Sequence, residues 1–352
     1  MSKPYPVDIV LTWVDGNDPE WEKQMLSFRP DAGGYKSSTS RARFRSWDNL
    51  QYIFRGIETF MPWVRTVHFV TWGHLPPWLN PDAEKLHIVR HDEFIPAEYL
   101  PTFNSNAILL NLFRIPGLAE RFIFFNDDTF VIQPVRKTDY FVRGLPRDSA
   151  ALTPFVVTPG GIAAQEMNNL EIINRYFSSA DVRANLGKWL NPLYGSYNLR
   201  TLIFLMWKGI NGVYEPHIPV GYLRSTCKTV WEKEFDVLDA TSRNRFRTKA
   251  DVSEWLFRQW QLMSGRFVPR DIRFGRYTVV PQHLDLIENT LKKPGRCKML
   301  CINDNVELKD FETARARVNS ALSELLPRKS HFERWSAAFD SPKGFIIHSH
   351  AV

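Results

Sequence analysis

Long hydrophobic runs are missing from this sequence of 352 residues. No stretch approaches the roughly 18–20 consecutive apolar residues that a membrane-spanning helix requires. The opening residues, MSKPYPVDIV, also lack the apolar segment of a secretory signal. We therefore expect a cytoplasmic protein without a transmembrane anchor.

Cysteine is scarce as well, because the chain contains only Cys227, Cys297 and Cys301. Cys297 and Cys301 are four residues apart, and no second pair completes a zinc-binding pattern. The odd number indicates reduced thiols rather than a disulfide framework. We expect the Cys301 thiol to be packed in the core rather than reactive.

Familiar nucleotide-binding signatures are absent too, since the chain has neither a GxGxxG segment nor a Walker sequence. It also lacks zinc-finger spacing and the aromatic signature of RNA-binding domains, so we expect no nucleic-acid partner. The formal net charge is +7. A basic surface of this kind suits phosphorylated metabolites or an anionic polymer, and it allows peripheral contact with the inner face of a membrane.

The composition is 44% hydrophobic and 14% aromatic, which is enough for a large core. Apolar segments typical of strands alternate with helical patterns through the first 135 residues, at 7–14, 67–71, 86–89 and 122–125. Such alternation predicts an α/β fold with a mostly parallel sheet.

The second half of the chain is richer in helical patterns, and one of them, Tyr197 to Trp207, predicts a buried helix. We assign residues 1–150 to an α/β core and residues 151–352 to a mainly helical part. The two parts are also compatible with one continuous domain.

A carboxylate pair follows the most apolar of the predicted strands, Phe122 to Phe125. Asp127 and Asp128 are costly to desolvate there unless a cation or hydrogen-bond donors offset their charge. Ligands also bind at the carboxyl ends of strands in open α/β sheets. The alternative is a capped turn, which the apolar residues on both sides disfavour. Both side chains can reach one metal only if the backbone turns between them, because side chains alternate along a strand.

Other predicted strands also end in polar residues. Asp15 follows the first strand, His74 the second and Asp92 the third. Because parallel strands end at the same edge of a sheet, we expect these residues to converge with Asp127 and Asp128. His74 is more typical of an edge residue than of a ligand.

The sequence resembles the Stealth family of sugar-1-phosphate transferases in four blocks that follow one another in the family's order. DIVLTWVDGNDPEW at Asp8–Trp21 is similar to the first block, and residues 41–132, with LPTFNSNAI and FRIPGLAERFIFFNDD, are similar to the second. EPHIPVGYLR and RFRTKADV resemble the third, and CINDN with SHFER resembles the fourth. One departure is TWGH, where some relatives carry TDGQ.

The resemblance implies that residues 1–150 form a Rossmann-like, GT-A-related core that binds a nucleotide sugar and a divalent cation, Mg²⁺ or Mn²⁺. It implies that residues 151–352 complete the active site and the acceptor region. It also implies the reaction. A hydroxyl of a glycan or polysaccharide acceptor attacks the β-phosphate of a UDP-sugar, UMP leaves, and a hexose-1-phosphate is transferred. The product is a phosphodiester-linked surface polysaccharide.

The same resemblance assigns the site residues. Asp127 and Asp128 become the metal ligands, and His217 becomes the general base, since imidazole exchanges protons near neutral pH. Arg247 completes the catalytic set, because a guanidinium fork matches phosphate oxygens. The expected substrate-binding residues are Trp13, Asp15, Gly16, Arg55, Asn104, Asn106, Arg114, Asn303, Asp304 and Asn305.

Structural roles are the alternatives for three of these residues: Trp13 in the core, Arg55 solvated on a helix, and Arg114 paired with Asp127. Two other functions also fit the sequence. One is a metal-dependent GT-A-type glycosyltransferase, which would release UDP instead of UMP. The other is a basic protein that binds an anionic polymer without catalysis.

Overall fold

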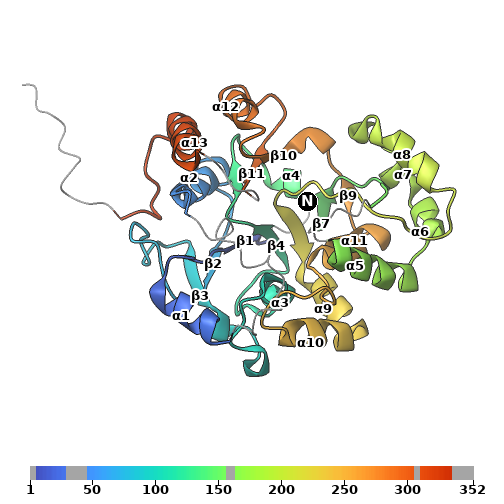
Figure 1. The fold of residues 1–352 in the computed structure, drawn as a ribbon. Coiled ribbons are helices and arrows are strands. Elements are labelled where there is room, and N and C mark those ends of the chain that lie inside the picture. Colours follow the sequence, from blue (N-terminus) through green and yellow to red (C-terminus); the bar gives the residue numbers. More distant parts are fainter. Residues whose placement is uncertain (1–4, 29–45, 156–162, 305–309, 335–352) are drawn as a thin grey trace, which may run out of the picture.

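The computed structural model describes residues 5–28, 46–155, 163–304 and 310–334. Asn305 lies outside these residues. The main sheet has the strand order β3-β2-β1-β4-β8 (Figure 1). Its strands are β1 (Asp8–Thr12), β2 (Val67–Thr71), β3 (Leu86–Arg90), β4 (Arg121–Phe125) and β8 (Val220–Leu223). The first four run parallel and β8 runs antiparallel to β4, which confirms the predicted α/β fold with a mostly parallel sheet.

Strand β4 is buried on both faces, as its apolar sequence predicts. Ile123 and Phe125 belong to one hydrophobic cluster, together with residues of β1 and β2. Phe122 and Phe124 belong to the cluster on the opposite face. The core therefore lies on both sides of the sheet.

Helices cover both faces of the sheet. Residues of α2, α12 and α13 enter the first cluster, and residues of α3, α5, α9 and α11 enter the second (Figure 1). The described helices of four residues or more are α1 (Pro19–Ser27), α2 (Leu50–Phe60), α3 (Ser105–Asn111), α4 (Lys137–Tyr140), α5 (Ala163–Tyr176), α6 (Ser179–Ala184), α7 (Leu186–Trp189), α8 (Tyr197–Phe204), α9 (Arg224–Lys233), α10 (Phe235–Arg243), α11 (Trp255–Met263), α12 (Leu284–Lys292) and α13 (Phe311–Leu325). Among the described residues, no helix combines the length and the apolar character that crossing a bilayer demands.

Two smaller sheets combine strands from the two halves of the chain. In one, β11 (Met299–Asn303) lies between β10 (Gly275–Val279) and β5 (Thr129–Val131). The other contains β6 (Phe141–Val142), β7 (Leu145–Asp148) and β9 (Val268–Pro269). The helical second half thus contributes strands to all three sheets, and the division at residue 150 stays a prediction.

Strand β8 forms one edge of the main sheet, and a glutamine side chain covers its free backbone groups. Gln261 of α11 accepts a hydrogen bond from the Leu223 N–H at 2.8 Å. Its amide donates to the Gly221 carbonyl at 3.1 Å. These are the bonds that a further strand would otherwise make.

The prediction of a buried helix over Tyr197 to Trp207 was wrong. Leu199 is 64% exposed and Met206 is 80% exposed. The polar Thr201 is fully buried instead, and its hydroxyl accepts a hydrogen bond from the Leu152 N–H at 3.1 Å. The helix lies at the periphery. Leu205 is buried and Phe204 packs partly against the core, but the other large apolar side chains of this segment face outward.

A buried ion pair joins β7 to α11. The guanidinium of Arg258 is fully buried and donates to both carboxylate oxygens of Asp148, at 2.7 and 3.0 Å. It also donates to the carbonyls of Tyr214 and Ser149. One side chain therefore ties together α11, β7 and the segment that leads into β8.

Removing the carboxylate should destabilise the fold strongly, because it leaves the Arg258 charge buried without its partner. We expect Asp148→Ala to lower the free energy of unfolding in urea by about 3–5 kcal/mol. The matched control is Asp92→Ala, which breaks the surface pair with Arg90, where both side chains are 58% exposed. That control should change stability by no more than about 1 kcal/mol. Equal losses in the two variants would contradict a stabilising role of the buried pair.

Candidate active site

The Asp127–Asp128 pair lies where the chain passes from one sheet to another. Strand β4 belongs to the main sheet, whereas β5, which begins at Thr129, pairs with β11 in the second sheet. The Ile302 N–H donates to the Asp128 carbonyl at 2.9 Å and so anchors the turn to β11. The two aspartates therefore lie in a turn, and their side chains need not point to opposite faces as they would along one continuous strand.

The carboxylate of Asp128 is only partly satisfied by hydrogen bonds. Its Oδ2 accepts from the Cys301 thiol at 3.3 Å and from the Asn303 amide at 3.1 Å. Its Oδ1 is buried and has no hydrogen-bond partner among the described residues. A buried acceptor of this kind is a position for a cation or a proton.

His217 reaches the same place from a distant part of the sequence. Its ring nitrogen, a carboxylate oxygen of Asp128 and the sulfur of Cys301 all lie within 4.8 Å of one another. The ring also lies against Tyr277, with 5.0 Å between ring centroids, and against Trp255, with 6.3 Å. Asp128 and His217, two of the predicted catalytic residues, thus lie close together in the fold.

The backbone of His217 is held in the left-handed region, with φ at 47°. A non-glycine residue in this region costs of order 1–3 kcal/mol and persists only where its neighbours enforce it. Ile218 supplies one such restraint, because it packs on Gly275 of β10. A Cβ atom at Gly275 would come within 2.5 Å of the Ile218 side chain. Only glycine therefore lets β10 approach the His217 loop this closely.

Helix α11 holds the His217 segment through one of its faces. Trp255, Arg258 and Gln259 are spaced three and four residues apart and share this face. Trp255 lies against the His217 ring, and Arg258 donates to the carbonyl of Tyr214. Gln259 donates at 3.2 Å to the carboxylate of Glu215. The sequence analysis did not identify these residues, because their contacts are tertiary and leave no local pattern in the sequence.

Glu215 forms an acidic pair with Glu166 of α5. Gln259 bridges them, since its amide also lies 3.2 Å from the Glu166 carboxylate, and the Ser253 hydroxyl donates to Glu166 at 3.4 Å. Burial raises the pKa of Glu215 well above its ordinary range, and the neighbouring Glu166 raises it further. Burial also raises the pKa of Glu166. The pair therefore retains a proton at pH values where isolated carboxyl groups are ionised.

Asp127 is accessible to solvent, so its desolvation is incomplete. The surrounding protein and the negative charge of Asp128 nevertheless raise its pKa to about 7. Near neutral pH this carboxyl group is therefore close to its midpoint of ionisation. A divalent cation beside it would favour the ionised form.

The donor set fits a hard cation better than a thiolate-bound metal. Burial raises the pKa of the Cys301 thiol well above its ordinary range, and the charge of Asp128 adds to the effect. The sulfur is thus a protonated donor to Asp128 rather than a metal ligand. The orphaned Oδ1 of Asp128 and the accessible carboxylate of Asp127 are the oxygen ligands that Mg²⁺ and Mn²⁺ prefer. All three cysteines are free and buried, as predicted.

The loop after β1 adjoins the acidic pair through the sheet register. Leu11 of β1 lies opposite Phe125 of β4, so the loop that carries Trp13, Asp15 and Gly16 starts beside the turn that carries the two aspartates. The Trp13 ring stacks on Phe69 with 5.8 Å between centroids. The predicted contacts of these three residues with a nucleotide stay predictions.

His74 orders this loop, a role that the sequence analysis missed. The Asp15 backbone N–H donates to the Nε2 atom of His74 at 2.7 Å, and the Nδ1 atom lies 3.5 Å from the Asp18 carboxylate. Burial lowers the pKa of His74, which favours the neutral ring that this acceptor geometry requires.

Asn104, Asn106 and Arg247 belong to a second cluster at the start of α3. The Asn104 amide donates to Asp251 at 2.8 Å, and its carbonyl oxygen accepts from the Asn106 N–H at 3.0 Å. Arg247 donates to the hydroxyl of Ser105 at 3.0 Å. These contacts join the second and third sequence blocks, and binding of sugar or phosphate by the three residues stays a prediction.

Three other predicted residues make contacts within the protein. Arg55 donates to both oxygens of Glu333, at 2.8 and 2.7 Å. Arg114 donates to Asn111 at 2.9 Å, with its guanidinium 4.7 Å from the centre of the Trp231 ring, an arrangement different from the ion pair with Asp127 that we considered. The third residue, Asp304, accepts a hydrogen bond from the indole of Trp47 at 2.9 Å. The expected substrate contacts of all three remain untested.

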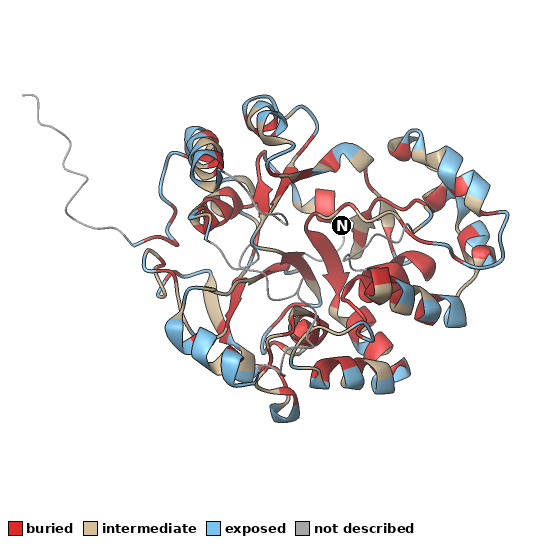
Figure 2. Ribbon diagram, viewed as in Figure 1, coloured by how far each residue is buried: buried red, intermediate tan, exposed pale blue. Residues whose placement is uncertain are grey.

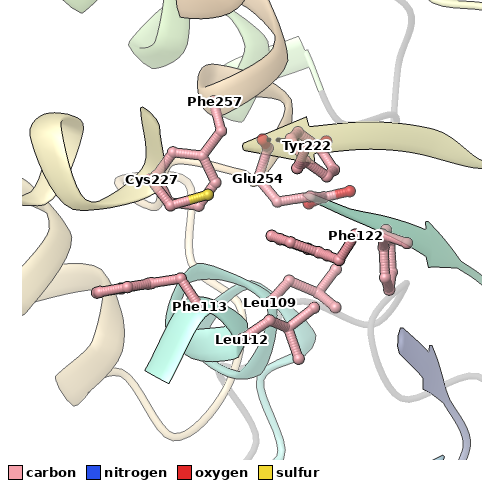
Figure 3. Close-up of a pocket in the computed structure, with 9 residues that line it drawn as sticks. Leu109, Leu112, Phe113, Phe122, Tyr222, Cys227, Glu254 and Phe257 are labelled. Carbon is pink, nitrogen blue, oxygen red and sulfur yellow. Dashed lines mark hydrogen bonds between the residues drawn. The ribbon is translucent and has the colours of Figure 1, made fainter. Parts of the chain in front are cut away.

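A small cavity in the core is separate from this chemistry. It encloses about 10 Å³, room for at most one water molecule, among apolar side chains such as Phe122 and Phe257 (Figure 3). Glu254 is the acidic residue on its wall, and burial raises the pKa of this side chain to about 7. Its size excludes a nucleotide sugar.

Comparison with known proteins adds to this geometry. Family models match twice: Stealth protein CR1, conserved region 1, over residues 5–31, and Stealth protein CR2, conserved region 2, over residues 43–147. The capsular polysaccharide phosphotransferase WcwK of Streptococcus pneumoniae is 38% identical over 93% of this chain and 98% of its own length. The exopolysaccharide phosphotransferase cps2G of Lactiplantibacillus plantarum is 34% identical over 95% of this chain and 98% of its own.

Among solved structures, the galactosyltransferase LgtC in complex with donor and acceptor sugar analogs is similar with a TM-score of 0.39. The two chains are 9% identical, and the match covers 90% of this chain and 95% of LgtC.

The acidic pair of Glu166 and Glu215 makes stability depend on pH. Because the pKa values are raised in the folded state, the folded protein keeps a proton that the unfolded chain releases above the ordinary value of 4.5. Below pH 4.5 this pair therefore does not make stability depend on pH. Stability falls as the pH rises through the folded-state pKa. The neutral variant Glu166→Gln should unfold on the order of 2 °C higher than the natural protein at pH 8, with a smaller difference at pH 5.

The control for this comparison is Glu171→Gln on the same helix, where the side chain is 77% exposed. Its thermal midpoint should follow that of the natural protein at both pH values. If Glu166→Gln raised the thermal midpoint equally at pH 5 and pH 8, the result would contradict a proton shared by the two carboxyl groups.

Proposed function

Because this chain belongs to the Stealth family, and resembles its polysaccharide phosphotransferases over nearly the whole chain, we propose that it is a sugar-1-phosphate transferase. It transfers a hexose-1-phosphate from a UDP-sugar to a hydroxyl group of a glycan and releases UMP. The observation that carries this proposal is the meeting of Asp128 and His217, which come from different sequence blocks, within 4.8 Å.

His217 acts as the general base in this proposal. Its imidazole takes the proton of the acceptor hydroxyl as the oxygen attacks the β-phosphorus of the donor. A new bond forms between that oxygen and phosphorus, and the bond from phosphorus to the bridging oxygen breaks. UMP leaves with the bridging oxygen, while the bond between the sugar and its phosphate stays intact. The left-handed backbone conformation of His217 sets the position of its imidazole, and therefore the place at which the proton is accepted.

Asp127 and Asp128 would hold Mg²⁺ or Mn²⁺ through carboxylate oxygens. The bound cation would neutralise charge on the diphosphate. Asn303 and Cys301 orient the Asp128 carboxylate by donating to its Oδ2, which keeps Oδ1 available. Trp13, Asp15 and Gly16 line the neighbouring loop, where we place the nucleotide, with Arg247 as a further phosphate contact.

The nucleotide product tests the reaction directly. With Mg²⁺, a panel of UDP-hexoses and capsule-like oligosaccharides, the protein should release UMP and generate a phosphodiester signal in the ³¹P spectrum. His217→Gln should lower the rate by about 10²–10⁴-fold, as expected for loss of a general base. The control His331→Gln, at a side chain that is 89% exposed, should keep the rate. Release of UDP alone would identify a glycosyltransferase, and binding without turnover would identify a polymer-binding protein.

Manganese titration tests the cation site independently of turnover. Asp128→Asn should weaken Mn²⁺ binding, measured by calorimetry, whereas Asp82→Asn at an exposed position should not. Since the pKa of Asp127 is about 7, binding to the natural protein should be about tenfold weaker at pH 6 than at pH 8. Asp127→Asn should abolish this pH dependence. Equal affinity in Asp128→Asn and the natural protein would rule out the assigned ligand.

A further inference from the structure

Exposed apolar side chains gather on α8 and the two residues that follow its C-terminal cap. Thirteen large hydrophobic residues are exposed on the described surface, and five of them lie in this single segment. Their exposed fractions are Leu199 64%, Leu202 51%, Ile203 45%, Met206 80% and Trp207 49%. We call these five residues the α8 patch. Apolar side chains gathered in this way mark an interaction surface, whereas isolated ones are ordinary.

The helix exposes more large apolar side chains than an ordinary surface helix does. Surface helices bury their apolar stripe and expose their polar face. In α8 the polar Thr201 is fully buried and its hydroxyl accepts from the Leu152 N–H. Leu199, Leu202 and Ile203 face outward instead. Tyr197, Phe204 and Leu205 supply the apolar contacts with the core, so the three outward side chains are left in water.

The chain segment that carries the patch has charge of one sign. Residues 182–214 contain four basic and no acidic residues. The basic residues are Arg183, Lys188, Arg200 and Lys208. Arg200 lies within the helix and Lys208 directly follows the patch, and both are exposed. A surface that is both apolar and basic complements an interface that is both apolar and anionic.

We propose that the α8 patch docks the protein on the surface of an anionic lipid bilayer. Leucine, methionine and tryptophan side chains would enter the boundary between headgroups and acyl chains, while Arg200 and Lys208 meet lipid phosphates. A second copy of the chain is a poorer occupant, because two identical basic surfaces would face each other. Acidic groups that could offset this repulsion are missing from 182–214.

The position of the patch suits such docking. Helices α6, α7 and α8 lie together at one edge of the molecule, away from the main sheet (Figure 1). The outer side of α8 is largely coloured as exposed (Figure 2). The chain then runs from Trp207 into the segment that carries Glu215 and His217. Docking through α8 therefore bears on the segment of the chain that supplies the proposed base, whatever reaction the site performs.

Vesicle flotation tests the proposal. The full-length protein should float with vesicles of phosphatidylglycerol and phosphatidylcholine at low salt, and should not float with phosphatidylcholine alone. Leu199→Ser/Met206→Ser should lower the partition coefficient at least tenfold. Arg200→Ser/Lys208→Ser should lower it by about fivefold for each charge removed. Raising the salt concentration should weaken binding of the natural protein.

The matched control is Leu286→Ser/Lys292→Ser on α12, which removes one exposed leucine and one exposed lysine elsewhere on the surface. It should bind vesicles like the natural protein. All variants should keep the natural thermal midpoint, because the altered side chains are exposed. Failure of the natural protein to bind anionic vesicles would overturn the proposal. So would equal binding by the α8 variants and the natural protein, or a dimer that Leu199→Ser/Met206→Ser dissociates.

Discussion

The carboxylate of Asp128, held at the junction of two sheets, is the constraint on which the site depends. Its backbone is anchored to β11 and its Oδ2 accepts two hydrogen bonds, so Oδ1 is left as a fixed, unpaired acceptor. Leaving such an atom unsatisfied opposes folding. The sheets on either side must therefore be stable enough to hold it. Their apolar strands, buried on both faces, supply that stability, and binding of the proposed cation would recover the cost.

Helix α11 holds the side chain of His217 in position, as the two sheets hold that of Asp128. Its aligned side chains contact the imidazole, the preceding carbonyl and the Glu215 carboxylate, while Gln261 closes the edge of β8. The helix is buried along its length, which makes these polar contacts rigid. Two elements that are far apart in the sequence thus define the position of the His217 imidazole relative to the Asp128 carboxylate. Precision of this kind requires neighbours that are themselves fixed by packing.

The sequence predicted the parallel strands because each contains a short, mainly apolar segment. It predicted the acidic pair because charge following the unbroken apolar run of β4 is unusual. It did not predict the strand Met299–Asn303, since its apolar stretch is short and polar residues follow. The buried contacts of α11 were also missed, because pairing of Arg258 with Asp148 is a tertiary event without a local pattern. Hydrophobicity alone was misleading at Tyr197–Trp207. An apolar helix is compatible with a core or with an interface, and only the fold distinguishes the two.

The glutamine that covers the edge of β8 affects how the protein behaves at high concentration. A bare sheet margin invites strands of neighbouring molecules to add on, which is a common start of insoluble aggregates. Here Gln261 occupies the outward amide of Leu223 and the outward carbonyl of Gly221. Many copies can therefore gather at high local density without joining backbone to backbone along this margin.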